Sequence, residues 1–219
     1  MRYFATYFLS VFFLSFPFLL QFAKGEEPKG LSSLPAAWTI PEAYHDVFEL
    51  VAEFIPNLHN QNIVVRAGKL ATTMNVRPSL FSLLFKNRDK RTYVIRVNTD
   101  SDFNGVLYED VPELARVGLV MHELMHIKDY KSRNFFGVLQ RGMQYLSVRG
   151  KTKFEQEIDR MVIEEGMRNY LFLWALYIME ESDAGFDYKE FKRSTYLTPA
   201  EIFIDFYDDG VLQDMPLIL

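Results

Sequence analysis

The sequence predicts an α+β fold in which a small mixed sheet packs on one long buried helix. The chain has 219 residues, of which 49% are hydrophobic, and this is ample for the core of a single domain. Segments with strand-like alternation lie between residues 62 and 108, and helical spacing of apolar residues dominates from residue 112 onward. We therefore expect the strands to precede the buried helix and further helices to follow it.

Four segments are candidates for the sheet. The clearest strand is Thr92–Asn98, whose apolar residues alternate along the segment, and Asn62–Arg66 is a shorter one. A further short strand is expected at Val106–Tyr108. The apolar run Leu80–Phe85 fits a strand or a short helix equally well, because periodicity does not separate the two over so short a run.

Helices are expected over residues 41–55, 112–131, 135–148, 153–181 and 198–206. The first begins with a proline, and the last begins with a capping box. Gly118 and Gly166 fall inside two of these helices, where glycine costs about 1 kcal/mol relative to alanine. We expect both glycines to permit close approach of another backbone.

Residues 1–25 are typical of a secretory signal peptide. Arg2 gives a positive start, residues 3–22 are almost wholly apolar, and Ala23 and Gly25 supply the small residues of a cleavage site. An uncleaved membrane anchor is the alternative, since about 20 apolar residues can span a bilayer. Either interpretation places the rest of the chain in a secreted, periplasmic or other extracytoplasmic location.

Composition limits the chemistry available. Residues 26–40 are rich in Pro, Gly and Ser and are expected to form an extended lead-in, followed by a single domain over residues 41–219. The net charge of −5 is mild, and no basic stripe indicates a nucleic-acid partner. The chain has no cysteine, which excludes disulfides, thiolate metal ligands and a cysteine nucleophile. Any metal ion must be held by His, Asp or Glu.

The long buried helix contains the motif His-Glu-x-x-His. His122 and His126 are four residues apart, so on a helix both side chains project from one face and can bind one zinc ion. Glu123 lies beside them and can reach a water on that ion, which is the arrangement of a metal-assisted hydrolase. The alternative is a pair of core histidines satisfied by carbonyls or carboxylates. The remaining two histidines, His45 and His59, are expected to be solvated.

A catalytic zinc site usually has three protein ligands, so a third must lie downstream. Glu155 and Asp159 occupy one face of the helix predicted for residues 153–181, without a cation beside them on that helix. Like charges so spaced repel unless something positive lies near them. We therefore expect Glu155 to be the third ligand and Asp159 to support the site, with a surface pair at a helix start as the alternative. Charges of alternating sign form a second, solvated stripe at Glu157, Arg160, Glu164 and Arg168.

The motif at residues 122–126 resembles that of the zincin metallopeptidases, specifically their gluzincin branch. Glu155-x-x-x-Asp159 is similar to the third-ligand motif of M48-type membrane-linked peptidases, and residues 155–159 also resemble the Glu-x-Glu-Ala-Asn/Asp pattern of ImmA/IrrE-like peptidases. The resemblance covers about residues 92–168. Lys128 departs from it, since zincins usually carry a hydrophobic residue two positions after the second histidine.

This resemblance implies a zincin-like fold and one Zn²⁺ per chain, bound by His122, His126 and Glu155. It also implies hydrolysis of peptide bonds in a peptide or protein substrate, with Glu123 as the general base. Two other interpretations remain open. In the first, the chain is a zinc-binding module without catalysis. In the second, it is a partner-binding protein that is anchored to a membrane through residues 3–22 and carries the motif by chance.

The resemblance gives two further expectations. In zincin-like folds an edge strand of the sheet pairs with extended substrate, and Thr92–Asn98 or Val106–Tyr108 would supply that edge. A tyrosine often stabilises the oxyanion in zincins, and the candidates here are Tyr170, Tyr188 and Tyr196. From its spacing alone, Asp129 is either a partner that orients an imidazole or a solvated helix residue.

Overall fold

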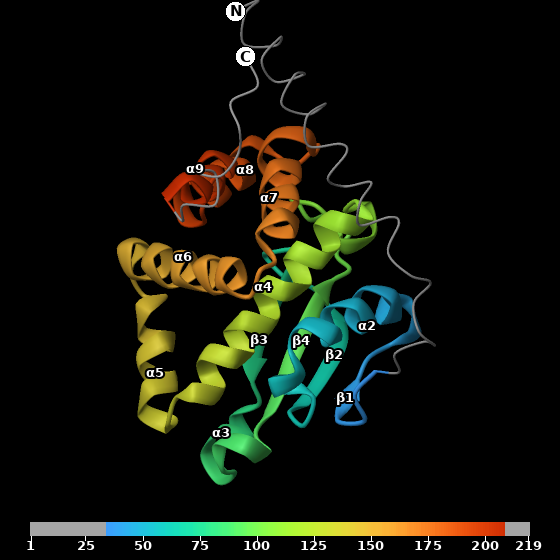
Figure 1. Cartoon of the computed structure of the whole chain (residues 1–219), viewed down its shortest axis with the longest axis vertical. Helices are drawn as coiled ribbons and strands as arrows, with labels where there is room; N and C mark the ends of the chain where they lie inside the picture. Colours follow the sequence, from blue (N-terminus) through green and yellow to red (C-terminus); the bar gives the residue numbers. More distant parts are fainter. Residues whose placement is uncertain (1–33, 209–219) are drawn as a thin grey trace, which may run out of the picture. The chain divides into compact units, whose positions relative to one another are not determined.

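The computed structural model describes residues 34–208, with side chains described as far as residue 204. The predictions for residues 1–25 and for most of the lead-in therefore lie outside the described residues. Within the described part the chain is a mixed α+β fold, in which helices outnumber the strands of one small sheet (Figure 1). No helix of this part is long and apolar enough to cross a membrane.

The sheet has four strands in the order β1-β2-β4-β3. Their bounds are Trp38–Thr39 (β1), Asn62–Gly68 (β2), Met74–Pro78 (β3) and Thr92–Asn98 (β4). β1, β2 and β4 are parallel, and β3 runs antiparallel to β4 at the edge, with Val76 opposite Ile95. Alternate residues of β2 and β4 are fully buried, because one face of the sheet packs on helices.

The helices follow and flank the sheet. Their bounds are His45–Phe54 (α2), Leu80–Phe85 (α3), Glu113–Ser132 (α4), Phe135–Gln144 (α5), Val148–Glu164 (α6), Arg168–Leu176 (α7), Phe186–Thr195 (α8) and Pro199–Asp208 (α9). Short 3₁₀ turns occupy Glu42–Tyr44, Pro56–Leu58, Arg88–Lys90 and Tyr108–Asp110, and a π-helical turn occupies Tyr177–Glu181. α2 and α4 lie together in front of the sheet in Figure 1, and α4 also packs against α7 and α6.

Several predictions for the sheet need correction. Residues 92–98 form a strand as expected, but β4 is internal to the sheet, whose edges are β3 and the two-residue β1. β3 was not predicted, although its residues alternate between apolar and polar, because it has only five residues and ends in Pro78. Residues 108–110 form a 3₁₀ turn rather than part of a strand, and the ambiguous run Leu80–Phe85 is a helix.

The lead-in ends earlier than predicted. Trp38 and Ile40 are buried in the core, and residues 38–39 pair with β2. The Trp38 indole N–H also donates to the Leu58 carbonyl at 3.2 Å. The packed domain therefore begins before Pro41.

The helix predicted for residues 153–181 is wrong, since it is divided at Gly166. Gly166 has φ +80°, its N–H donates to the Ile163 carbonyl at 2.9 Å, and the Met167 N–H donates to the Val162 carbonyl at 3.1 Å. These two bonds form a Schellman motif, the usual helix ending with glycine in the left-handed conformation. A Cβ at Gly166 would meet no atom within 4 Å. The glycine is thus required by backbone conformation and not, as predicted, by close packing.

Gly118 does permit the close approach that the sequence predicted. A Cβ added there would lie 2.1 Å from the Tyr170 carbonyl oxygen in α7. α4 and α7 are therefore in direct backbone contact at this point. This contact places the middle of α4, which carries the histidine motif, deep in the core.

His45 and His59 are not simply solvated, as the sequence had suggested. Both are partly buried, and each uses its Nε2 for a hydrogen bond to a backbone carbonyl. His45 bonds to Ile40 at 2.9 Å, and His59 bonds to Ala52 at 2.8 Å. Both histidines stabilise the ends of α2 and its turns.

Candidate metal centre

The structure brings together the three residues predicted as metal ligands. His122 and His126 come from α4, and Glu155 comes from α6, which packs against it. The distances are 3.2 Å between the two Nε2 atoms, 3.1 Å from His122 Nε2 to Glu155 Oε2 and 3.2 Å from His126 Nε2 to the same oxygen. All three residues are at least 95% buried.

These three atoms are arranged as ligands of a single metal ion would be. Zinc bonds to imidazole nitrogen and carboxylate oxygen are about 2.0–2.1 Å long, so tetrahedral geometry separates the ligand atoms by about 3.4 Å. The triangle of 3.1–3.2 Å edges is close to that spacing. Two imidazoles and one carboxylate also form a donor set typical of catalytic zinc, which leaves a fourth position open. The residues present therefore fit the ion.

Asp159 supports the site in the way the sequence predicted. Its Oδ1 lies 2.8 Å from His122 Nδ1, while its Oδ2 accepts the Leu197 N–H at 2.9 Å. With Nδ1 held by the carboxylate, His122 presents Nε2 to the centre. Asp159 is one turn beyond Glu155 on α6, so a single helix face supplies one candidate ligand and the group that orients His122, another candidate.

His126 is positioned by packing. Its ring stacks on Tyr130 at a centroid distance of 6.0 Å and meets the edge of Phe154 at 5.1 Å. No hydrogen-bond partner among the described residues reaches its buried Nδ1. The two histidines thus differ, because His122 is oriented by a carboxylate and His126 by aromatic rings.

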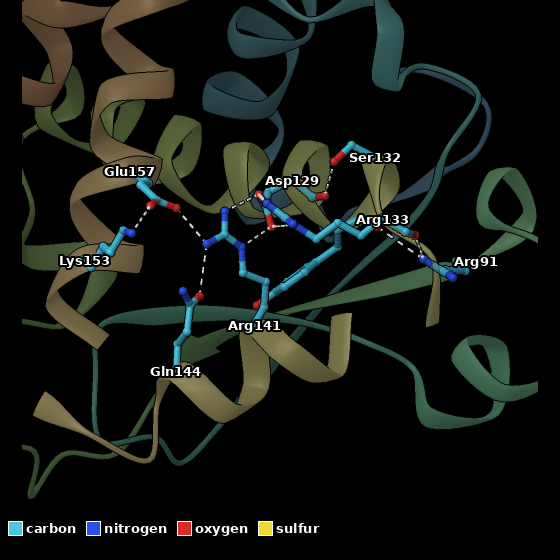
Figure 2. Close-up of polar contacts among 9 residues, drawn as sticks. Arg91, Asp129, Ser132, Arg133, Arg141, Gln144, Lys153 and Glu157 are labelled. Atoms are coloured by element: carbon cyan, nitrogen blue, oxygen red, sulfur yellow. Dashed lines mark hydrogen bonds and ion pairs between the residues drawn. The ribbon is translucent and has the colours of Figure 1, made fainter. Parts of the chain in front are cut away.

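Asp129 does not orient an imidazole. It accepts hydrogen bonds from Arg133 at 2.8 and 2.9 Å and from Arg141 at 2.8 and 3.0 Å (Figure 2). Arg141 also donates to Glu157 at 2.7 Å, and it lies over the ring of Phe154 at 4.3 Å. Arg141 on α5 therefore links α4 to α6. We call the group of Asp129, Arg141 and Glu157 a brace, because it holds α6, the helix that carries Glu155, against α4.

Neighbouring contacts account for two residues that the sequence analysis singled out, Glu157 and Lys128. Glu157 was assigned to a solvated stripe, yet it is two-thirds buried and bound to Arg141. Lys128, which departs from the zincin pattern, forms an ion pair with Glu165 at the end of α6. Both contacts link α6 to the rest of the domain, so their residues have structural roles that helix periodicity does not reveal.

Glu123 is buried beside the ligands and keeps an unused acceptor. Its side chain is 5% exposed, and no donor among the described residues reaches Oε2. Burial raises the pKa of this carboxyl, and the neighbouring imidazoles of His126 and His122 lower it only in part. A buried carboxylate oxygen without a donor is costly unless a water, a metal or a substrate group meets it.

Without a metal, the cluster holds a proton. Burial lowers the pKa of His122, but the hydrogen bonds to Asp159 and Glu155 outweigh this and raise its pKa to about 10. The two imidazoles hold the pKa of Glu155 well below its usual range, despite the opposing effect of burial. A metal cation at the same place would replace the positive charge that His122 carries.

The three tyrosines considered for stabilising an oxyanion lie in different surroundings. Tyr196 lies 5.5 Å from the His122 ring, centroid to centroid, whereas the Tyr188 hydroxyl is 3.3 Å from Thr73 Oγ1 and Tyr170 sits against Gly118. Only Tyr196 of the three lies against a ligand ring. Sequence reasoning missed Tyr145, whose hydroxyl donates to Glu155 Oε1 at 2.5 Å. It ends α5, and nothing in its local sequence shows that α5 folds back against α6.

No family model matches the chain, and comparisons with curated proteins and with solved structures gave no significant match.

Proposed function

We propose that this chain is a zinc-dependent metallopeptidase of zincin-like fold that hydrolyses peptide bonds. The observation that carries the proposal is the buried triangle of His122, His126 and Glu155, with the unmet oxygen of Glu123 beside it. The donor set favours zinc over harder ions, because two of the three donors are imidazole nitrogens.

The residues have distinct roles in this proposal. His122, His126 and Glu155 would hold the ion, which would supply Lewis-acid chemistry by lowering the pKa of a water and polarising the scissile carbonyl. Glu123 accepts the proton of that water and passes it to the leaving amine. The raised pKa of Glu123, caused first by burial, supports this role because a carboxyl that shuttles a proton near neutral pH must hold it readily.

The sheet supports a peptide as the substrate. β3 is the edge strand that packs against α4, and its outer side has no strand partner within the described sheet. An extended peptide can add to such an edge through main-chain hydrogen bonds. Tyr196, beside His122, is the candidate for stabilising the oxyanion. Secretion after removal of residues 1–25 completes the proposal, and N-terminal sequencing of the exported protein tests it.

Metal content of the purified chain is the first test. We expect one zinc per chain by elemental analysis, with affinity greatly reduced in Glu155→Ala and peptide cleavage abolished in Glu123→Gln although zinc is retained. Glu53→Gln, at an exposed site on α2, is the matched control. A zinc-loaded parent that cleaves no peptide in a diverse library would leave only the non-catalytic zinc module. Failure to bind zinc at neutral pH would refute the proposal.

A further inference from the structure

Lys192 on α8 is a buried cation without a hydrogen-bond acceptor. Its side chain is 5% exposed, and its Nζ lies 4.2 Å from the centroid of Tyr196 and 5.5 Å from that of Trp174. Aromatic faces attract an ammonium, but they leave its N–H donors unmet. No carboxylate or carbonyl among the described residues bonds to this Nζ.

A second lysine faces the same aromatic group. Lys151 Nζ lies 4.0 Å from the centroid of Phe191, and Lys192 Nζ lies 6.0 Å from that of the same ring. Lys151 is one turn before Glu155 on α6 and is partly buried, and it has no ion pair with any described acid. Burial lowers its pKa, and the charge of Lys192 lowers it further against the opposing effect of Glu155. The two ammonium groups thus lie against one aromatic ring, and no ion pair joins either of them to a described acid.

Two of the three nearby carboxylates are already engaged. Glu155 meets both histidines and Tyr145, and Asp159 meets His122 and the Leu197 N–H. Glu123 feels the charge of Lys192, but no hydrogen bond joins the two. Buried or half-buried cations are costly unless an anion meets them. No carboxylate of the described residues bonds to either ammonium, so both are open to an anion from outside the described chain.

We propose that Lys151 and Lys192 form an anion subsite beside the metal centre and that it binds a carboxylate of the substrate. The inference rests on the proposed peptidase function and adds its substrate class, which is peptides with a carboxylate close to the scissile bond. That carboxylate is an acidic side chain or the free C-terminus. Ammonium groups suit either one, because each is a compact charge whose donors adapt to the acceptor.

The first experiment measures cleavage by the zinc-loaded full chain. Peptides are compared in pairs that differ in one carboxylate, Glu against Gln near the scissile bond and a free against an amidated C-terminus. We expect the carboxylate member of one pair to be favoured in kcat/KM by tenfold or more, since a charge-assisted hydrogen bond is worth at least that factor. Lys192→Met and Lys151→Met should each reduce this preference while cleavage of the neutral peptide persists.

Two variants control for unintended effects. Lys153→Met removes an exposed lysine from the same helix and should leave the preference unchanged. Lys192→Arg keeps the charge and should retain part of the preference, which separates loss of the anion site from misfolding. Equal cleavage of charged and neutral peptides by the parent would overturn the inference and leave the peptidase intact.

A binding measurement keeps the two proposals distinguishable. Trp174 lies beside Lys192, so its fluorescence reports on that site. N-acetylglutamate α-amide carries only the side-chain carboxylate, N-acetylglycine carries only the terminal one, and N-acetylglutamine α-amide carries neither. Binding of one acid that is weakened about tenfold in Lys192→Met supports the subsite even if no peptide is cleaved. Fluorescence that responds equally to the neutral probe would count against it.

Discussion

Tyr145 holds Glu155, the proposed third ligand, from the side away from the two histidines. Its hydroxyl donates to Glu155 Oε1, leaving Oε2 to face the two histidines. Tyr145→Phe should weaken zinc binding about 10- to 100-fold, the usual effect of losing a group that orients a ligand, while the ring still packs on Phe154. Competition with a chelator measures this affinity. Tyr177→Phe removes a hydroxyl bonded to the Asp110 carbonyl and should have no effect, so equal affinity in both variants would contradict the role.

His122 makes the stability of the metal-free chain depend on pH. Its pKa is raised to about 10 in the folded state, from about 6.5 in an unfolded chain. The proton therefore binds the folded state more tightly, and its contribution is fully present below pH 6.5 and is lost as pH rises through 10. Urea unfolding in a chelator should show stability falling by a few kcal/mol across that window. Asp159→Asn should flatten the profile, and a parent profile already flat between pH 6.5 and 10 would contradict the assignment.

At the scale of helices, the contact of α4 with α7 depends on one missing side chain. Gly118→Ala should destabilise the domain by about 1–3 kcal/mol, because the new methyl group would overlap the Tyr170 carbonyl and outweigh the gain in helix propensity. Gly142→Ala is the control, since α5 leaves open space there and alanine should stabilise by up to about 1 kcal/mol. Denaturant unfolding compares the two. Equal effects would mean that α4 and α7 are not in backbone contact.

Helices were easier to predict than their endings and partners. The buried helix of residues 112–131 carries strong apolar content and agrees with α4 to within a residue or so. The sequence contains Gly166 but does not reveal its left-handed conformation, so the sequence predicts one helix where the structure has two. β3 was not predicted because it has only five residues and ends in a proline, although its residues alternate in burial.

At the scale of the whole molecule, the site forms where helices distant in the sequence pack together, and local sequence patterns do not predict that packing. The three residues of the cluster were predicted because a motif places two of them on one helix and a repelling pair indicates the third on another. Asp129 and Arg141 were not recognised as a brace, since they lie on different helices and meet only when α5 folds back. The same holds for Lys151 and Lys192, which come from α6 and α8 and share one aromatic ring.

Because ligands from α4 and α6 meet at one point, zinc should stabilise the whole domain. Zinc at a thousand times its dissociation constant stabilises the folded state by about 4 kcal/mol if the unfolded chain does not bind it. For a chain of this size that corresponds to a rise in Tm of about 10 °C, which calorimetry of the full chain resolves. Glu155→Ala removes the ligand from α6 and should abolish most of the rise, whereas Glu53→Gln should preserve it. A Tm that zinc does not change would mean that the triangle is a hydrogen-bonded cluster, in which protonated His122 takes the place of the ion.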